Sequence, residues 1–342
     1  MKRRQFILSL AGTAAAGLAG WRIAQVKGGA GTRRGNLPTG PLAKFSRTGW
    51  ALGTQVTLTV FHDDRATAEE AMDEALAEID RVEQVMSLYR PGSELSRLNR
   101  VKQLDNPHPW LVEVLQSASR LSEQSNGAFD VTVQPLWTLY YSRSKARTQP
   151  TEAELQAELA KVDWRRVEVS DQKIRLRGEG TEITLNGIAQ GFAADAVGRV
   201  FRQYGITSAL IDTGEIGTVG THVQKDGWSI GIKHPRNQQE FLGLARLDNR
   251  CMATSGDYET RFSEDFSQHH LLDPHTGHSP RELSSVSVAA PTALQADALS
   301  TAVFLLGLEK GRQLIEATPG TDALFVTKDG RTVQTSQFPL IV

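Results

Sequence analysis

The segment that decides the fold is Ala290-Pro291-Thr292-Ala293-Leu294-Gln295-Ala296-Asp297-Ala298-Leu299-Ser300-Thr301. Pro291 and Thr292 are typical of a helix entrance, and the apolar residues after them predict a helix over 294–306. Segments typical of strands lie on either side, at 284–290 and 323–328. The sequence therefore predicts a strand, a helix and a second strand near the C-terminus.

Outward from this unit, strands and helices are mixed without the regular alternation that a parallel sheet requires. Alternating apolar residues predict a strand over 54–61, and an apolar stripe predicts a helix over 66–86. Thr151-Glu152-Ala153-Glu154 has the pattern of a capping box that opens a short helix. Other helices are expected at 109–124 and 189–204, and other strands at 167–170, 173–177, 181–185, 208–212, 228–233 and 242–247. The pattern predicts one α+β domain over residues 46–342, with mixed, largely antiparallel sheets packed by helices.

The composition is that of an ordinary soluble protein with a hydrophobic core. Of 342 residues, 39% are hydrophobic and 23% are charged. Lys and Arg number 38 and Asp and Glu 39, so the basic excess of a nucleic-acid-binding protein is missing. Cys251 is the single cysteine, which excludes an internal disulfide and a cysteine-rich metal site. Any metal would be held by oxygen atoms or histidine.

Residues 1–30 have the features of an export signal. Lys2-Arg3-Arg4 precedes an apolar run over 6–20, which is too short to cross a bilayer comfortably. The pair Arg3-Arg4, followed after one residue by Phe6, is similar to a twin-arginine signal, which exports folded proteins. An ordinary secretory signal with two arginines is the alternative.

We therefore expect a periplasmic protein. No clean A-x-A cleavage site is evident, so the uncleaved signal could also anchor the protein, with residues 31–45 as a tether.

Asp297 and Thr301 are four residues apart, so a helix places them on one face. Their neighbours are apolar, and a buried carboxylate needs a partner. Oxygen ligands completed by water and phosphate are what Mg²⁺ prefers. The alternative is an aspartate that only caps the first turn of its helix.

Asn186-Gly187-Ile188-Ala189-Gln190-Gly191 follows a predicted strand and opens a predicted helix. Small residues and a helix N-terminus suit a phosphate group. This pattern differs from G-x-G-x-x-G, and a plain tight turn explains it equally well.

A histidine-rich segment runs from His269 to Gly277 and contains the turn sequence Asp273-Pro274-His275-Thr276-Gly277. Neighbouring strand residues point to opposite faces, so only one of His269 and His270 can face a site. A neutral imidazole there could take a proton from an attacking hydroxyl.

Three shorter segments are unremarkable when each is taken alone. They are the turn-like Ala253-Thr254-Ser255-Gly256-Asp257-Tyr258, Gly127-Ala128-Phe129-Asp130, and Tyr89-Arg90-Pro91-Gly92-Ser93-Glu94.

Taken in order, these segments resemble the ApbE family of FAD:protein FMN transferases over about residues 48–310. The matching segments are Met86-Ser87-Leu88-Tyr89 with Ser93-Glu94-Leu95-Ser96-Arg97-Leu98-Asn99, Gly127-Ala128-Phe129-Asp130, Gly187-Ile188-Ala189-Gln190-Gly191 with Asp195, Ala253-Thr254-Ser255-Gly256-Asp257-Tyr258, His270-Leu271-Leu272-Asp273-Pro274 with Thr276-Gly277, and Ala290-Pro291-Thr292 with Ala296-Asp297-Ala298 and Thr301. The resemblance implies a single ApbE-like, T-fold-like domain.

The resemblance also implies roles for individual residues. Asp297, Thr301 and the Gly187 carbonyl would bind Mg²⁺, and His270 or Asp273 would be the catalytic base. The residues expected to contact FAD are Leu52, Tyr89, Ala128, Phe129, Asp130, Thr184, Gln190, Thr254, Ser255, Gly256, His270 and Leu271. The implied reaction is attack of a Thr or Ser hydroxyl of a partner flavoprotein on the FMN phosphorus of FAD, with AMP leaving.

The sequence departs from the family pattern in three places. Thr184 stands where an Asp is frequent, Gln190 where a Lys is frequent, and Gly214-Glu215-Ile216 is one residue shorter than Gly-Gly-Asp-Ile. The ion would then bind more weakly, or Glu215 would compensate. These changes, with the twin-arginine pattern, resemble the NosX branch, which is linked to flavinylating a membrane-bound regulator of nitrous oxide reduction.

Two other functions remain open from the sequence. The same site could act as an FAD pyrophosphatase that releases FMN and AMP without a protein acceptor. Alternatively, the altered loop could have cost catalysis and left a flavin-binding maturation factor.

Overall fold

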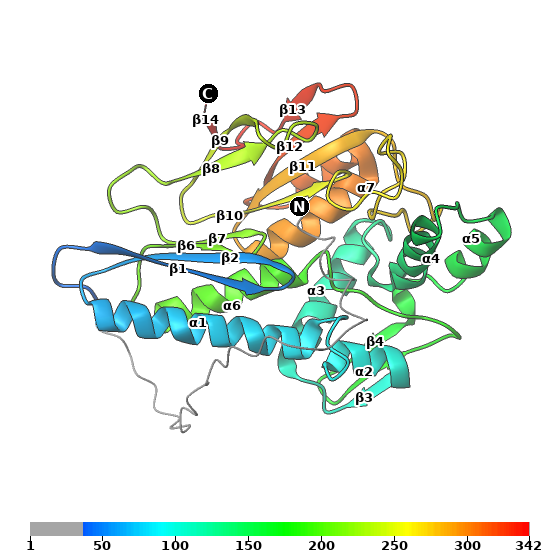
Figure 1. The fold of residues 1–342 in the computed structure, drawn as a ribbon, viewed down its shortest axis with the longest axis horizontal. Helices are drawn as coiled ribbons and strands as arrows, with labels where there is room; N and C mark the ends of the chain where they lie inside the picture. Colours follow the sequence, from blue (N-terminus) through cyan, green and yellow to red (C-terminus); the bar gives the residue numbers. More distant parts are fainter. Residues whose placement is uncertain (1–36, 342) are drawn as a thin grey trace.

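The computed structural model describes residues 37–341 (Figure 1). The helices are α1 (Arg65–Met86), α2 (Glu94–Val101), α3 (Pro109–Gln124), α4 (Gln134–Lys145), α5 (Glu152–Leu159), α6 (Ala189–Gln203) and α7 (Ala293–Ala317), with 3₁₀ turns η1 (Val131–Val133) and η2 (Trp164–Arg166). The strands are β1 (Ala43–Ala51), β2 (Thr54–His62), β3 (Gln103–Asp105), β4 (Val167–Val169), β5 (Lys173–Leu176), β6 (Ala209–Asp212), β7 (Ile216–Val219), β8 (Trp228–Lys233), β9 (Phe241–Leu247), β10 (Cys251–Gly256), β11 (Leu283–Ala290), β12 (Asp322–Thr327), β13 (Thr332–Gln334) and β14 (Leu340–Ile341). No helix within 37–341 combines the length and apolarity that crossing a bilayer requires.

An eight-stranded antiparallel sheet in the order β1-β2-β6-β7-β10-β11-β12-β13 is the centre of the fold. Helices α1, α6 and α7 cover one face of this sheet, and the small sheet β14-β9-β8 covers part of the other (Figure 1). A third sheet, β3-β5-β4, lies with α2 and α3 at one end of the molecule. The predicted α+β domain with largely antiparallel sheets is confirmed.

Burial along the central strands follows from this layering. Every residue of β11 is buried, because its two faces meet different layers. Val288 packs in the core shared with α7, whereas the next residue, Ala289, packs against Trp228 of the small sheet. The strand–helix–strand unit expected near the C-terminus is therefore β11, α7 and β12.

Local patterns predicted several elements closely. Helix α3 and strand β8 have the predicted bounds, and the capping box of Thr151 and Glu154 forms at the start of α5. Helix α7 is longer than expected: it extends to Ala317, with a break in helical geometry at Gly307 (φ 78°, ψ −178°). The N-cap of α7 is Thr292, so Asp297 is not a capping residue.

The strand predicted over 181–185 is wrong. Ile183 and Leu185 are buried as a strand pattern requires, yet this segment pairs with no strand among the described residues. The side chain of Asn99 instead bonds both main-chain groups of Ile183, at 2.8 Å each, and Thr184 N donates to Val131 O at 2.7 Å. Hydrogen bonds to a side chain and to a loop thus take the place of pairing with a neighbouring strand. An alternation of apolar residues cannot distinguish these two arrangements.

Two further boundaries differ from the predictions. Ala253–Gly256 is not a turn after a strand but part of β10 itself, because it pairs along β11 from Cys251 to Gly256. Strand β1 begins at Ala43, so the sheet includes the last residues of the predicted 31–45 tether. The predicted signal, residues 1–30, lies outside the described residues.

Candidate active site

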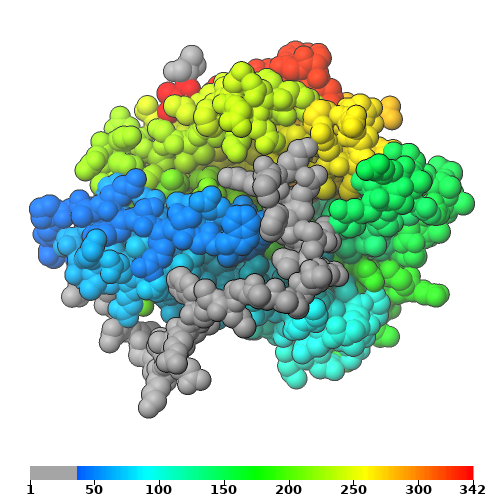
Figure 2. Space-filling view, in the orientation of Figure 1, coloured from blue at the N-terminus to red at the C-terminus, as the bar shows by residue number. Residues whose placement is uncertain are grey.

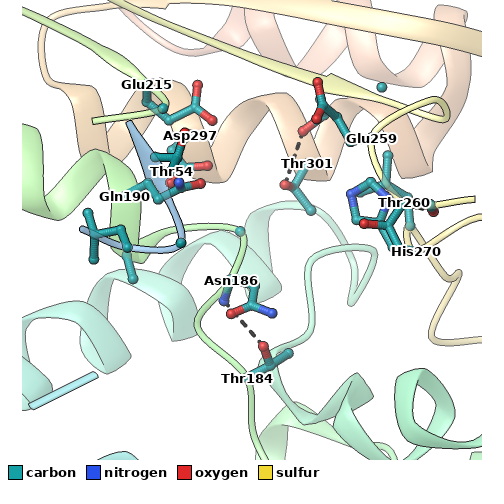
Figure 3. Close-up of a pocket in the computed structure, with 18 of the residues that line it drawn as sticks. Thr54, Thr184, Asn186, Gln190, Glu215, Glu259, Thr260, His270, Asp297 and Thr301 are labelled. Carbon is teal, nitrogen blue, oxygen red and sulfur yellow. Dashed lines mark hydrogen bonds between the residues drawn. The ribbon is translucent and has the colours of Figure 1, made fainter. Parts of the chain in front are cut away.

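A cleft of about 830 Å³ lies between several segments. These are the β1–β2 turn, the start of α6, the end of β10 with the segment after it, and the first turns of α7. Segments far apart in the sequence line it, including 52–54, 186–190, 254–262 and 270–272. Figure 3 shows side chains from these segments and from α7 turned toward the same space. The cleft thus collects most of the separate motifs in one place.

Asp297, Thr301 and Gly187 meet at this cleft. Asp297 is 4% exposed, and its Oδ2 accepts a hydrogen bond of 2.9 Å from Gly191 N at the start of α6. A Cβ atom added to Gly187 would lie 2.9 Å from Thr301 Oγ1, so the Gly187 main chain closely approaches that hydroxyl. Gly191 is equally constrained, since its Cβ would lie 2.2 Å from Ala293 O.

The hydroxyl of Thr301 is held from a second side by β10. Ser255 Oγ lies 3.2 Å from Thr301 Oγ1 and 2.8 Å from Ser300 Oγ. The first turn of α7 is fixed as well, because the carboxylate of Asp195 accepts from Ala293 N and Leu294 N at 2.9 Å each. Burial raises the pKa of Asp195, and these two hydrogen bonds oppose the increase. Small residues and short contacts therefore bring α6 and α7 together at the cleft.

The residues present fit a magnesium ion. A carboxylate, a hydroxyl and a glycine main chain provide only oxygen donors, which are the ligands that Mg²⁺ prefers alongside water and phosphate. Within residues 37–341, no group of three or more His, Cys, Asp or Glu residues is placed so that it could hold one metal ion. Such a site would share the ion with a substrate phosphate instead of enclosing it completely.

His270 is the histidine of the pair that reaches the cleft. Its Nδ1 lies 3.3 Å from Thr260 O, and its main-chain N donates to the same oxygen at 2.9 Å. A carbonyl oxygen only accepts, so this contact favours the tautomer with the proton on Nδ1 and the lone pair on Nε2. His269 points away: it is fully buried, and its Nε2 lies 3.2 Å from Pro280 O.

Comparison with known proteins identifies the family. The sequence profile of the ApbE family matches residues 52–325. The chain belongs to the ApbE family.

Two curated relatives named FAD:protein FMN transferase are similar to most of this ApbE-family chain. The protein from Treponema pallidum is 31% identical over 317 residues, which cover 84% of this chain and 86% of that protein. The protein from Haemophilus influenzae is 32% identical over 307 residues, which cover 83% and 89%.

Solved ApbE structures have the same fold. The ApbE protein from Thermotoga maritima matches with a TM-score of 0.79 at 26% identity, over 87% of this chain and 100% of that one. The flavinyl transferase ApbE from Pseudomonas stutzeri, in its apo form, matches with a TM-score of 0.77 at 28% identity, over 90% of this chain and 100% of that one.

Asp273, the other candidate base of the ApbE resemblance, does not line the cleft. Its carboxylate accepts from His275 N at 2.9 Å and from Thr276 Oγ1 at 3.1 Å, within its own turn. The structure thus gives Asp273 the role of a turn former. The Asp-Pro-x-Thr-Gly pattern was itself a turn signal, and that local explanation accounts for the residue.

Most residues expected to contact FAD line the cleft, and Ala128 is the exception. The lining residues from that prediction are Leu52, Tyr89, Phe129, Asp130, Thr184, Gln190, Thr254, Ser255, Gly256, His270 and Leu271. Asp130 lines it but directs its carboxylate elsewhere, accepting from Thr132 N at 2.7 Å and Trp164 N at 2.9 Å. Burial raises the pKa of Asp130, while these bonds lower it. Asp130 therefore shapes the wall of the cleft.

Two of the three departures from the family pattern, Gln190 and the shortened loop, meet in one corner of the cleft, whereas Thr184 lies on another part of its lining. Gln190 Nε2 donates to Thr213 O at 3.2 Å, and a Cβ on Gly214 (φ 100°) would lie 2.5 Å from that nitrogen. Glu215 lines the cleft and accepts from Thr254 N at 3.2 Å, and Figure 3 shows it beside Asp297 and Gln190. The shorter loop is thus fitted to Gln190, and it adds a carboxylate near Asp297.

A buried ion cluster anchors the segment after β10. Asp257 is fully buried, and it accepts two bonds from Arg236, at 2.7 and 2.8 Å, and one from Lys328 at 2.5 Å. The next residues, Tyr258, Glu259 and Thr260, line the cleft, and Thr260 positions His270. Asp257 is therefore a structural support for the wall that carries the histidine.

Some cleft residues were missed at the level of sequence. Thr54, Glu259 and Thr260 are among them, and helix α4 contributes Trp137, Tyr141 and Lys145. The rings of Trp137 and Tyr141 stack at 5.0 Å with an angle of 8°. Their spacing of four residues was an available signal, since it places both rings on one face of a helix.

Proposed function

We propose that the chain transfers FMN from FAD to a Thr or Ser hydroxyl of a partner protein, with release of AMP, and that the transfer depends on Mg²⁺. One observation carries the proposal: Asp297 and Thr301, one turn apart on α7, line the same cleft as Gly187, and Thr301 closely approaches the Gly187 main chain. The names of the curated relatives support the reaction, and the oxygen-only donor set supports the ion.

The chain's own residues would divide the work of binding. Asp297, Thr301 and Gly187 would hold the ion, which would draw charge from the pyrophosphate of FAD. The main-chain N–H groups at the start of α6 would face the phosphates. Tyr89, which is 47% exposed, could stack on a flavin or adenine ring.

His270 would accept the proton of the acceptor hydroxyl. The contact of Nδ1 with Thr260 O leaves the lone pair on Nε2, which is the form that a general base requires. The hydroxyl oxygen would then form a bond to the FMN phosphorus, and the bond from that phosphorus to the AMP oxygen would break. AMP would leave with the electron pair of that bond, and positioning with charge neutralisation would supply most of the catalysis.

We also propose where the reaction takes place. The twin-arginine pattern supports export to the periplasm, with an uncleaved signal as an anchor. The similarity to the NosX branch supports a membrane-bound flavoprotein of nitrous oxide reduction as the acceptor. A cell fractionation with Arg3→Lys and Arg4→Lys together tests the route: the double variant should remain in the cytoplasm.

Mass spectrometry of membrane proteins from cells with and without this chain would identify the acceptor. The purified chain with FAD, Mg²⁺ and that acceptor should then yield a covalent adduct of FMN mass on a Thr or Ser. Asp297→Ala should abolish the adduct, whereas Asp226→Asn, an exposed acidic residue outside the cleft, should not change it.

Two results would contradict this function. Rapid AMP release without any acceptor would indicate an FAD pyrophosphatase. An unchanged cellular phenotype with Asp297→Ala would indicate a maturation factor that needs no catalysis.

A further inference from the structure

In the part of the chain that the structure describes, strand β1 forms an open edge of the eight-stranded sheet. Among residues 37–341, its one strand neighbour is β2, with which it pairs from Ala43 to Ala51. A nine-residue edge strand exposes a row of main-chain groups that another extended chain can pair with. Natural proteins usually shorten or cover such an edge, so a long one calls for an explanation.

The register shows which main-chain groups of β1 point outward. Phe61 N donates to Ser208 O at 2.9 Å, so Phe61 is bonded on its β6 side. In an antiparallel strand the bonding side alternates from residue to residue, and Phe61 is paired with Lys44. The main-chain groups of Lys44, and of every second residue after it, therefore face away from β2.

These outward-facing residues are Lys44, Ser46, Thr48 and Trp50, and all four are exposed. The intervening residues lie on the side of α1, where Phe45 packs in the core and Arg47 pairs with Asp73. Figure 2 shows the corresponding blue segment at the surface. Trp50 is 66% exposed, which is unusual for a large aromatic residue, and its ring is positioned to provide a cross-strand contact for an incoming chain.

The open edge leads directly into the cleft. After Ala51 the chain turns at Leu52 and Gly53, and residues 52–54 all line the cleft. The turn is fixed by a hydrogen bond of 3.0 Å from Leu52 N to Glu83 Oε1. Figure 1 shows the β1–β2 hairpin running along the edge of the sheet, with its turn directed toward the side of the molecule that carries α4.

We propose that β1 is the docking edge for the acceptor protein: an extended segment of the acceptor pairs with the β1 main chain and places its Thr or Ser hydroxyl at the cleft. This proposal rests on the proposed function, which requires a protein hydroxyl to reach the site. Strand addition obtains affinity from main-chain hydrogen bonds, and alternate side chains supply specificity. The edge is about 30 Å long, so it can align a segment before that segment enters the cleft.

The test compares two substitutions of Thr48, using as probe the acceptor identified by mass spectrometry in its unflavinylated form. Thr48→Pro removes one outward N–H without removing a β1–β2 bond, whereas Thr48→Val keeps that N–H and the β-branched shape. Thr48→Pro should raise the KM for the acceptor about fivefold or more, which corresponds to the loss of one hydrogen bond. Thr48→Val should resemble the wild type, and both variants should bind FAD normally.

A wild-type KM for Thr48→Pro would overturn the docking proposal and leave the proposed function intact. A wild-type protein that forms no adduct at all would overturn the function and the docking proposal with it. The two failures are therefore distinguishable.

Hydrogen exchange of the wild-type protein provides a test that does not depend on a variant folding. Adding the acceptor should slow exchange of the Lys44, Ser46, Thr48 and Trp50 amides. Unchanged exchange with bound acceptor would contradict the proposal. Protection that appears without acceptor and grows with protein concentration would assign the edge to a second copy of this chain, and would overturn the proposal as well.

Discussion

Gly187→Ala should disable the cleft while leaving the fold largely intact. Gly187 has no positive φ, so alanine fits its backbone. The new Cβ, however, would lie 2.9 Å from Thr301 Oγ1, closer than such atoms normally approach. Thr301 cannot simply move aside, because Ser255 Oγ contacts the same hydroxyl at 3.2 Å. A displacement of about 1 Å in a catalytic arrangement can cost about 100-fold in rate, and we expect a loss of that order.

The assay is a comparison of Gly187→Ala, Thr301→Ala and the double variant, each measured for adduct formation against Mg²⁺ concentration. Thr301→Ala removes the hydroxyl that the new methyl group meets, so the second substitution should add little to the first. The free energy of unfolding should fall by about 1 kcal/mol or less for Gly187→Ala, since the new methyl group meets only the half-buried side chain of Thr301.

Two results would refute this reasoning. A Gly187→Ala protein with the wild-type rate and Mg²⁺ dependence would show that Thr301 and the Gly187 main chain do not act together. Fully additive losses in the double variant would show that the two residues act independently.

Three further outcomes are expected. Asp257→Ala should lower the free energy of unfolding by about 3 kcal/mol in denaturant titrations, because it leaves two cationic partners without their buried carboxylate; a loss below 1 kcal/mol would show that water compensates for it. His270→Ala should lower the rate of adduct formation about 100-fold or more, whereas Asp273→Asn should retain most of it, and the reverse result would assign the base to Asp273. Burial lowers the pKa of His269 to about 4 from an ordinary 6.5. Between pH 6.5 and pH 4 the unfolded chain therefore binds a proton at His269 that the folded chain does not bind. The free energy of unfolding should accordingly fall by up to about 3 kcal/mol as the pH drops from 6.5 to 4. His269→Gln should flatten that part of the stability profile, and an unchanged profile would assign the pH dependence to other groups.

Local patterns were sufficient for elements whose stability is local. The apolar stripe of α1, the proline at the start of α3 and the capping box of α5 each report interactions within a few residues, and each appeared where it was expected. The segment 181–185 failed because its decisive partner, Asn99, is far away in the chain. An alternation of apolar residues indicates burial on one side, but it does not reveal what satisfies the main chain.

The residues of the candidate site, like the helices and strands, were predicted from the sequence in part. All the site residues predicted from the motif order except Ala128 and Asp273 line the cleft, but the motifs left the choice of base open between His270 and Asp273. Only the folded chain separates them, since one lines the cleft and the other closes its own turn. Trp137 and Tyr141 belong to no motif, and they become part of the site because α4 packs beside it.

By itself, the sequence determined the class of fold, the positions of most helices and the set of residues able to bind an ion and a phosphate, because these depend on periodicity, turn chemistry and residue type. The tertiary structure alone decided that Gln190 fits the shortened loop and that β1 presents, among residues 37–341, an open edge beside the cleft. Such contacts join segments that are distant in sequence, and their geometry is set by how the layers pack, which no local pattern encodes.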